Sequence, residues 1–346
     1  MVYGRALLAA DGDAAAYLAH AIEDQRAALQ IDDLELQANA HAFLGRALVF
    51  AARFDDAISL AEEGLARFPR RIPRAQWIVG INPYAVLSAG RAWSLHWTGR
   101  LADALEERER LRRLAEEDES LEMICYLEVF AGEAHYLAHD AALGLEAARR
   151  VEEITRTLGE PPKMVGYAAV TISYVHLMAE RALDAIASAR VAFEHLQRTD
   201  RLWSGWAATL LAAALLAAGE FSAAEAAADE AITWCRRTGR GNYEAMAHGV
   251  MARVLIRRDG ITARAAIETA LDTAAALIDR TGARVLAPAL LEWRAELAAS
   301  LGDEETCEQQ LRQAEQGYAE IGAPKHAQRL AARHGTHYSA PAHGKL

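Results

Sequence analysis

A helix-pair pattern returns along the chain about every 40 residues, and this limits the possible folds more than any other feature. The small residue near the start of each second helix falls at Ala57, Ala104, Gly144, Ala185, Ala224, Ala265 and Cys307. The intervals between these positions are 47, 40, 41, 39, 41 and 42 residues. A fixed period of about 20 to 50 residues is typical of solenoids, in which each unit buries its apolar face against its neighbours.

The clearest copy of the pattern runs from His41 to Pro69. Its logic is steric, because small side chains let two helices approach while larger apolar side chains fill the space between them. Proline then ends the second helix because it cannot continue one. The small positions are Gly45, Ala52, Ala57, Ala61 and Gly64, and the filling ones are Leu44, Leu48 and Phe54. Other copies cover Arg91–Leu111, Leu210–Ile232 and Arg294–Ala314, and weaker ones centre on Gly144, Ala185 and Ala265.

These copies resemble the tetratricopeptide superfamily over nearly the whole chain. The resemblance implies an all-α fold, a right-handed superhelix of about seven to eight antiparallel helix pairs. The longer period adds about one and a half helical turns to the standard repeat of about 34 residues. We expect one solenoid over 1–333, with capping helices over 1–32, repeats over 33–321 and a last helix over 322–333. Residues 334–346 lack periodicity, so we expect a disordered tail.

The C-terminal stretch carries a second resemblance. Leu286–Arg333 contains a Pro-Ala-Leu-Leu run, then Ala-Glu-Leu and Gly-Asp, and finally Ile-Gly-Ala-Pro followed by His-Ala-Gln-Arg-Leu. It is similar to the C-terminal helical arm of large bacterial signalling proteins, either class III nucleotidyl cyclase–ATPase–tetratricopeptide proteins or LuxR-type ATP-binding regulators. Because this sequence contains no cyclase, ATPase or helix-turn-helix pattern, their enzymatic functions do not carry over. It would be a detached arm, a fragment or a stand-alone relative.

Composition favours a helical protein in a reducing compartment. Alanine is abundant, and the formal net charge of -11 disfavours non-specific nucleic-acid binding. Cys125, Cys235 and Cys307 are far apart, which argues against a disulfide framework or a zinc site. The sequence shows no signal peptide, and the most apolar stretch, Trp203–Gly219, is expected to be a buried helix and not a membrane span. We therefore expect a cytoplasmic location.

No motif predicts catalysis. The sequence lacks GxxxxGK[ST], GxSxG, HExxH and GxGxxG patterns, so we expect no enzyme activity, no cofactor and no metal. His135 and His139 would share a helical face, but no third ligand accompanies them. The acidic pairs Asp55-Asp56 and Glu304-Glu305 precede second helices, where the helix dipole explains them.

One set of residues suggests a binding surface. First helices line the concave face of such solenoids, and aromatic side chains recur there in the N-terminal half. Large amphipathic rings suit a peptide or small ligand, although aromatic stripes at helical spacing usually belong to a core. We therefore keep both readings open for Trp93 and Trp97. The predicted groove residues are Arg46, Phe50, Trp93, His96, Trp97, Glu133, Tyr136, Tyr174, Met178 and Trp206.

The function predicted from these features is a non-catalytic protein-interaction scaffold. It would act as the regulatory or sensor arm of a bacterial signalling or transcription-control system, with a protein or peptide partner. The alternative is a small-ligand (inducer) receptor that uses the concave aromatic groove. Neither nucleic acid nor membrane is an expected partner, and exposed residues on the end repeats would permit homo-oligomers.

Overall fold

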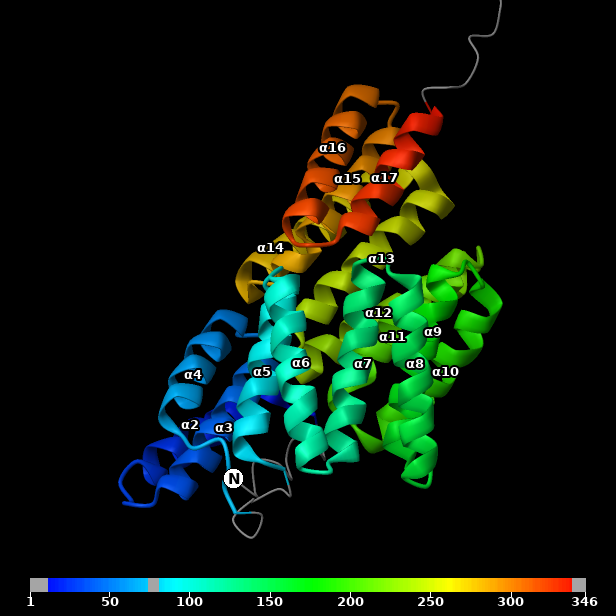
Figure 1. Ribbon diagram of the computed structural model, residues 1–346. Helices are drawn as coiled ribbons and strands as arrows, with labels where there is room; N and C mark the ends of the chain where they lie inside the picture. The colour runs from blue at the N-terminus through cyan, green and yellow to red at the C-terminus, as the bar shows by residue number, and fades with distance from the viewer. Residues whose placement is uncertain (1–11, 74–80, 338–346) are drawn as a thin grey trace, which may run out of the picture.

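The computed structural model describes residues 12–73 and 81–337, and consecutive helices pack there as antiparallel pairs (Figure 1). No strand occurs in those two ranges. The seven pairs are α3 (Leu34–Phe50) with α4 (Phe54–Arg67), α5 (Pro83–Trp97) with α6 (Leu101–Glu117), α7 (Leu121–Leu137) with α8 (Ala141–Thr157), α9 (Pro162–Met178) with α10 (Ala182–Thr199), α11 (Ser204–Ala217) with α12 (Phe221–Thr238), α13 (Gly241–Asp259) with α14 (Arg264–Thr281), and α15 (Ala287–Ser300) with α16 (Glu304–Glu320). This confirms the predicted tetratricopeptide-like α-solenoid.

Within the described residues, single helices flank the pairs and three short 3₁₀ segments join some of the longer helices. The helix α2 (Ala14–Ala28) precedes the pairs and α17 (Pro324–His337) follows them. The 3₁₀ segments are η2 (Arg201–Trp203), η3 (Gly260–Ala263) and η4 (Arg284–Leu286). The last helix thus runs four residues past the end predicted for it at 333. The rest of the predicted tail and the first part of the predicted cap lie outside the described residues.

The turn inside each pair explains the period. One residue with positive φ stands in every turn: Ala52, Gly99, His139, Glu180, Gly219, Gly260 and Gly302. Each lies five residues before one of the predicted small positions, so the two series share their spacing. The left-handed conformation reverses the chain within about three residues, which brings the two helices of a pair into contact.

One predicted small position is displaced. In six pairs the small residue is the fourth residue of the second helix, as Ala57 is in α4. In the sixth pair η3 follows Gly260 and delays α14, so the fourth residue is the buried Ile267 while Ala265 is exposed. The chain keeps its turn there but moves the packing register by two residues.

Acidic side chains lie in the first turn of two second helices, where the sequence predicted an interaction with the helix dipole. Asp55 and Asp56 lie in the first turn of α4, and Glu304 and Glu305 lie in the first turn of α16. Negative charge there opposes the positive end of the helix dipole. In three pairs an arginine just before the helix bonds an aspartate three residues later: Arg53 with Asp56, Arg100 with Asp103, and Arg181 with Asp184.

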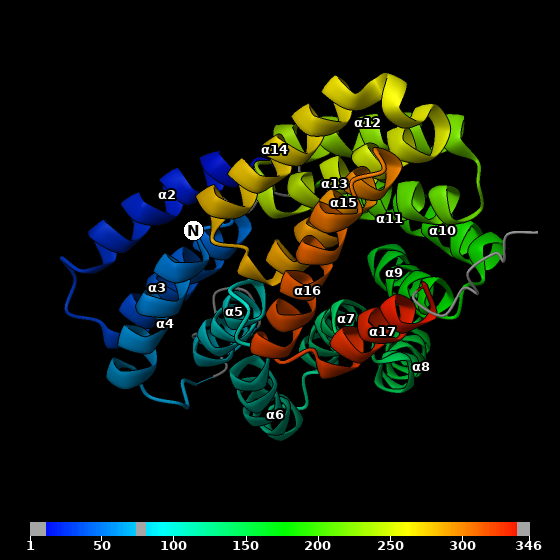
Figure 2. The same ribbon diagram turned by 90° about the horizontal axis from the view of Figure 1, so that it is seen from above.

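The array curls so that its later helices return to its earlier ones, as Figure 2 shows from above. Arg240, just before α13, donates to the carbonyl oxygens of Val49 and Phe50 at the end of α3. Arg284 in η4 pairs with Asp55 of α4 at 2.9 Å. His326 of α17 bonds the Leu137 carbonyl at the end of α7. The first helices of the pairs therefore face a shared interior.

No helix in the two described ranges is both long and apolar enough to cross a bilayer.

Candidate binding cleft

The middle of the shared interior is filled by aromatic side chains. Trp97 and Trp206 are the largest fully buried side chains of the described residues. Phe54 stacks on the Trp97 ring with centroids 5.8 Å apart, and the Tyr243 ring meets Trp97 edge-on at 5.2 Å. Such offset and edge-on pairs add to the stabilisation gained by burial. The rings of this aromatic centre are Tyr17, Phe50, Phe54, Trp93, Trp97, Phe130, Tyr167, Tyr174, Trp203, Trp206 and Tyr243.

A buried carboxyl group lies within the aromatic centre. Glu133 of α7 accepts hydrogen bonds from the hydroxyl groups of Tyr243 at 2.9 Å and Tyr174 at 3.2 Å. Trp206 Nε1 donates to the Tyr174 hydroxyl at 2.6 Å. His96 Nε2 lies 3.9 Å from the second carboxyl oxygen of Glu133. Four first helices, α7, α9, α11 and α13, thus contribute to one hydrogen-bonded network, and His96 of α5 lies beside it without a hydrogen bond.

Burial sets the charge of this network. It raises the pKa of Glu133 to about 7, against which the two tyrosine hydrogen bonds act only partly. It lowers the pKa of His96 to about 3, helped by the nearby His135. Removal of water penalises the ionised form of each group, which is why an acid and a base shift in opposite directions.

Arg240 closes the aromatic centre next to α3. Its side chain is buried, and its guanidinium carbon lies 4.6 Å from the Trp203 ring centroid and 5.1 Å from that of Tyr243. Arg240 donates to two carbonyl groups at the end of α3, and of these the Val49 carbonyl also accepts from the Ala52 N–H at 3.1 Å. Cation–π contacts and the two backbone hydrogen bonds offset part of the cost of burying this charge, and burial still lowers the pKa of Arg240.

A small aromatic pocket of about 130 Å³ remains beside Arg240 in the N-terminal half. Arg46, Phe50 and Trp93 line it, as do Tyr126, Lys163 and Asp200. Its charged groups are already engaged: the Tyr167 hydroxyl donates to Asp200, and Lys163 lies over the Tyr126 ring. The pocket is small for an organic ligand, since such sites occupy about 300 to 1,000 Å³.

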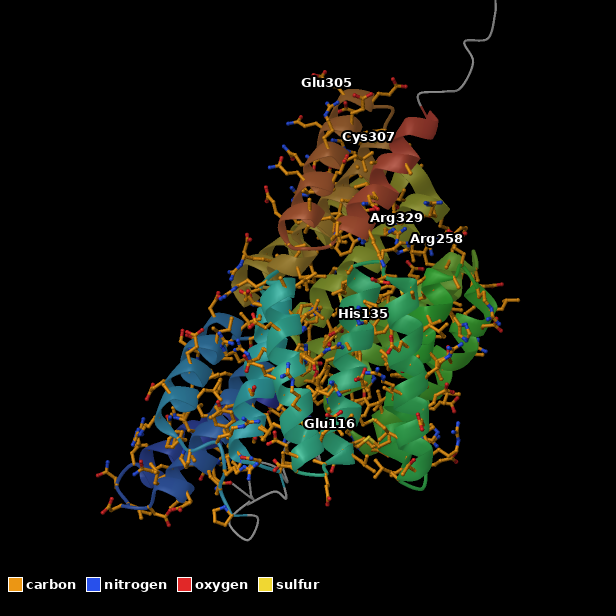
Figure 3. The ribbon with its side chains drawn as sticks, viewed as in Figure 1. Glu116, His135, Arg258, Glu305, Cys307 and Arg329 are labelled. Atoms are coloured by element: carbon orange, nitrogen blue, oxygen red, sulfur yellow. The ribbon has the colours of Figure 1, made fainter. Side chains whose placement is uncertain are left out.

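A cleft of about 670 Å³ opens in the C-terminal half, and we call it the C-terminal cleft. Its walls are residues of α7, α9, α11, the start of α12, α13, η4, α15, α16 and α17. The apolar part is formed mainly by Leu177, Met178, Leu210, Ala213, Leu216, Phe221, Met246, Val250 and Trp293. Arg329 on α17, labelled in Figure 3, marks one of its walls.

Two groups of charged side chains line the C-terminal cleft. Arg253 Nε of α13 donates to both carboxyl oxygens of Glu296 on α15, at 3.1 and 3.2 Å. Burial works against the charge of Arg253, but Glu296 outweighs it and raises the arginine pKa. A terminal nitrogen of Arg257 lies 4.0 Å from Glu296, beyond hydrogen-bond distance.

The second group centres on Glu292 of α15. The carboxylate accepts from the Tyr318 hydroxyl at 2.5 Å and from Arg329 at 3.0 Å, and His326 Nε2 lies 3.1 Å from it. Burial raises the pKa of this carboxyl group, but the bond with His326 and the charge of Arg329 hold it down at about 2. The Tyr318 and His326 rings stack at 3.7 Å. The group fixes α17 against α15.

The structure divides the predicted groove residues between these three places. Trp97, Tyr174, Trp206, Glu133 and His96 lie in the buried centre. Arg46, Phe50 and Trp93 line the small aromatic pocket. Tyr136 and Met178 are partly exposed and line the C-terminal cleft.

Sequence reasoning missed the charged wall of the cleft. Arg253, Arg257, Glu292, Glu296, His326 and Arg329 were not among the predicted residues. A usable signal existed, because Arg253 and Arg257 are four residues apart on one first helix, as are Glu292 and Glu296 on the next. The predicted groove positions stopped at the fifth repeat, whereas the cleft extends through the seventh.

The histidine pair does not form as the sequence suggested. His135 is buried in α7, but the helix ends at Leu137 and His139 lies beyond it with φ of 55°. The two side chains therefore do not share a helical face. Among the side chains described, no group of three or more metal-binding residues gathers.

Comparisons with known proteins indicate the fold. No family model matches the chain, and no curated protein matches it in sequence. The structure of a Rap protein complexed with Competence and Sporulation Factor is similar, with a TM-score of 0.55 at 11% identity over 82% of this chain and 77% of the other.

Two further similar structures have TM-scores below 0.5. The apo form of RapI gives 0.45 at 11% identity, over 89% of this chain and 82% of that one. A human IFIT1 dimer with m7Gppp-AAAA gives 0.43 at 15% identity, over 93% and 70%. The similarity to the Rap complex, together with the seven helix pairs, shows a tetratricopeptide-like helical-repeat fold.

Proposed function

We propose that this chain is a non-catalytic regulatory scaffold whose partner enters the C-terminal cleft. The observation that carries the proposal is the cleft itself, about 670 Å³ built from the first helices of consecutive repeats and bounded by α17. Concave faces of helical repeats are the surfaces on which such proteins bind their partners. The partner is a peptide or a segment of another protein, and the system is the bacterial signalling or transcription control that the C-terminal resemblance implies.

The similar Rap structure holds Competence and Sporulation Factor, which supports a binding role for this type of fold. The exclusion of nucleic acid rests only on the net charge of -11.

A small-ligand receptor is the second candidate, and the cleft volume favours it. About 670 Å³ lies within the range of about 300 to 1,000 Å³ that small-molecule sites occupy. The cleft combines an apolar wall with a few converging polar groups, as those sites do. In this reading the ligand sets the state of the scaffold, and a separate surface contacts the protein partner.

A screen for changes in melting temperature tests both. Short peptides and metabolites are added to the purified chain, because a ligand that binds the native state raises its stability. The matched variant is Ala213→Trp, which fills the cleft from a partly exposed position of α11. We expect at least one compound to raise the melting temperature of the wild type and not of this variant. If every stabilising compound acts equally on both, the cleft is not the site.

A further inference from the structure

The charged wall of the C-terminal cleft carries more positive than negative charge. On α13, α15 and α17 it holds three arginines, Arg253, Arg257 and Arg329, against two glutamates, Glu292 and Glu296. The third glutamate, Glu180, is exposed after the end of α9, which packs on the other side of α11. The two histidines of the cleft are His139, in the turn after α7, and His326. The side of the cleft formed by α13, α15 and α17 thus carries one more arginine than glutamate, while the whole lining holds three of each.

Two of these arginines have N–H groups that make no hydrogen bond within the described residues. Arg253 uses only its Nε, with Glu296, and Arg257 has no hydrogen-bond acceptor among the described residues. Their side chains are 35% and 58% exposed, so their terminal N–H groups reach the cleft. Both guanidinium groups share the one carboxylate of Glu296. A planar guanidinium with free N–H groups binds a carboxylate or phosphate in a bidentate manner.

The opposite side of the cleft is mainly apolar: the Thr209 hydroxyl is bonded to its own helix, and the one charged group there is the exposed Glu180 after α9. Leu177, Met178, Leu210, Ala213 and Leu216 come from α9 and α11 and offer only apolar side chains. A ligand that spans the cleft therefore meets guanidinium groups on one side and aliphatic carbon on the other. Burying apolar surface drives the association, while the charge pair fixes the orientation.

We infer that the occupant of the C-terminal cleft pairs one anionic head group, held by Arg257 and Arg253, with an apolar body against α9 and α11. The inference rests on the proposed function, since it assumes that the cleft is the binding site. Carboxylate and phosphate share the chemistry that a guanidinium recognises. It follows that a ligand with the same apolar body but a cationic or neutral head group should bind more weakly.

Calorimetric titration with three probes of equal chain length tests the charge. Decanoate, decanol and decyltrimethylammonium are titrated into the full-length wild-type chain below their aggregation concentrations. We expect decanoate to bind at least about tenfold more tightly than decanol, because a hydrogen bond to a charged group contributes that much. Decyltrimethylammonium should bind most weakly, and decyl phosphate then separates a phosphate preference from a carboxylate one. The decanoate affinity should fall as salt screens the pair.

Three variants locate the binding. Arg257→Gln should weaken decanoate about tenfold and leave decanol unchanged. Arg264→Gln is the control, because Arg264 is also 58% exposed but lies on α14 outside the cleft. Ala213→Trp should abolish binding of every probe, with circular dichroism confirming that the variant is folded.

The outcomes distinguish the two proposals. If decanol or the cationic probe binds as tightly as decanoate and Ala213→Trp abolishes both, the cleft remains the site and the anionic inference is overturned. If decanoate binds equally well to Ala213→Trp, the cleft is not the site and the proposed function fails. No binding by any of the probes, or equal loss in Arg257→Gln and Arg264→Gln, also overturns the anionic inference.

Discussion

The N-terminal and C-terminal halves of the interior use the same first helices in opposite ways. Around α3, α5 and α7 stacked rings fill most of the space, and Arg240 there is buried and bonded to two backbone carbonyl groups. Around α11, α13 and α15 the space stays open, and Arg257 keeps its terminal N–H groups free of acceptors within the described residues. Similar repeats thus supply a core in one half and a cleft in the other, depending on whether aromatic side chains fill the space.

The largest expected effect concerns the filled half. Trp97→Ala should lower the free energy of unfolding by about 3 to 5 kcal/mol, because the fully buried ring leaves a cavity that its neighbours cannot fill. Trp293→Ala in the cleft should cost clearly less, because Trp293 is only partly buried. Urea unfolding of both variants measures the difference. Equal losses would mean that the two halves are packed alike.

Substitution of Arg240 and of Arg257 compares the two halves through smaller losses in the free energy of unfolding. Arg240→Ala should lower the free energy of unfolding by about 3 kcal/mol, since it leaves the Phe50 carbonyl without its donor, removes one of two donors from the Val49 carbonyl and takes the cation away from four rings. Arg257→Ala should change it by less than about 0.5 kcal/mol, as exposed side chains usually do. The same denaturation measurement decides, and a cost for Arg257 near that for Arg240 would contradict the view of the cleft as open.

The buried carboxyl group gives the filled half a pH dependence. The pKa of Glu133 is raised to about 7 in the folded protein, so folding takes up a proton between about pH 4.5 and 7. This contribution to stability is present in acid and is lost as the pH rises through 7. Glu133→Gln removes the titrating proton, so the stability of the variant relative to wild type should rise by roughly 2 kcal/mol between pH 5 and pH 8.

The other titrating groups do not obscure this test. The lowered pKa values of His96 and His135 act in the opposite direction in acid, where these neutral groups resist protonation. They remain in both proteins, so their contribution largely cancels in the difference. Unfolding free energies measured at several pH values should diverge between wild type and Glu133→Gln, and parallel curves would show that Glu133 stays ionised when buried.

The smallest expected effect lies at the rim of the cleft. Glu180 occupies the left-handed turn between α9 and α10 with φ of 56°. Glycine adopts this conformation without the clash of a Cβ atom, so Glu180→Gly should stabilise the chain by about 0.5 to 1 kcal/mol. Thermal unfolding measures it, with Gly219→Ala as the converse change in the turn of the next pair, where φ is 78° and stability should fall.

The sequence predicted the repeats well because local geometry decides them. The turn residues from Ala52 to Gly302 and the small residues five positions later depend on neighbours within one pair, so their spacing shows in the sequence. The displaced Ile267 was missed because a short 3₁₀ segment has no comparably strong pattern. The end of α7 at Leu137 was also missed, so His135 and His139 were predicted to share a helical face although a turn separates them.

The site was predicted less completely because closure of the array is not local. The residues around Trp97 in the sequence do not predict that Tyr243 packs edge-on against it, or that Arg240 bonds the end of α3, because both contacts join distant parts of the chain. The aromatic stripe was recognised, but whether it faces a ligand or the far end of its own chain depends on how far the superhelix turns. The curvature of the superhelix accumulates from the small rotation between successive helix pairs. The residue at any single position does not predict this rotation.

The bonds from Arg240 to α3 and from Arg284 to Asp55 join residues separated by 190 and 229 positions. An open solenoid melts from its ends, because each terminal unit has only one neighbour to lose. Here the first pair is also bonded to Arg240, which precedes the sixth pair, and to Arg284, which precedes the seventh, so it has more than its one sequence neighbour to lose. Hydrogen exchange of α3 and α13 should proceed through one common opening, and deleting α15–α17 should loosen α4 and α5 at the other end of the sequence.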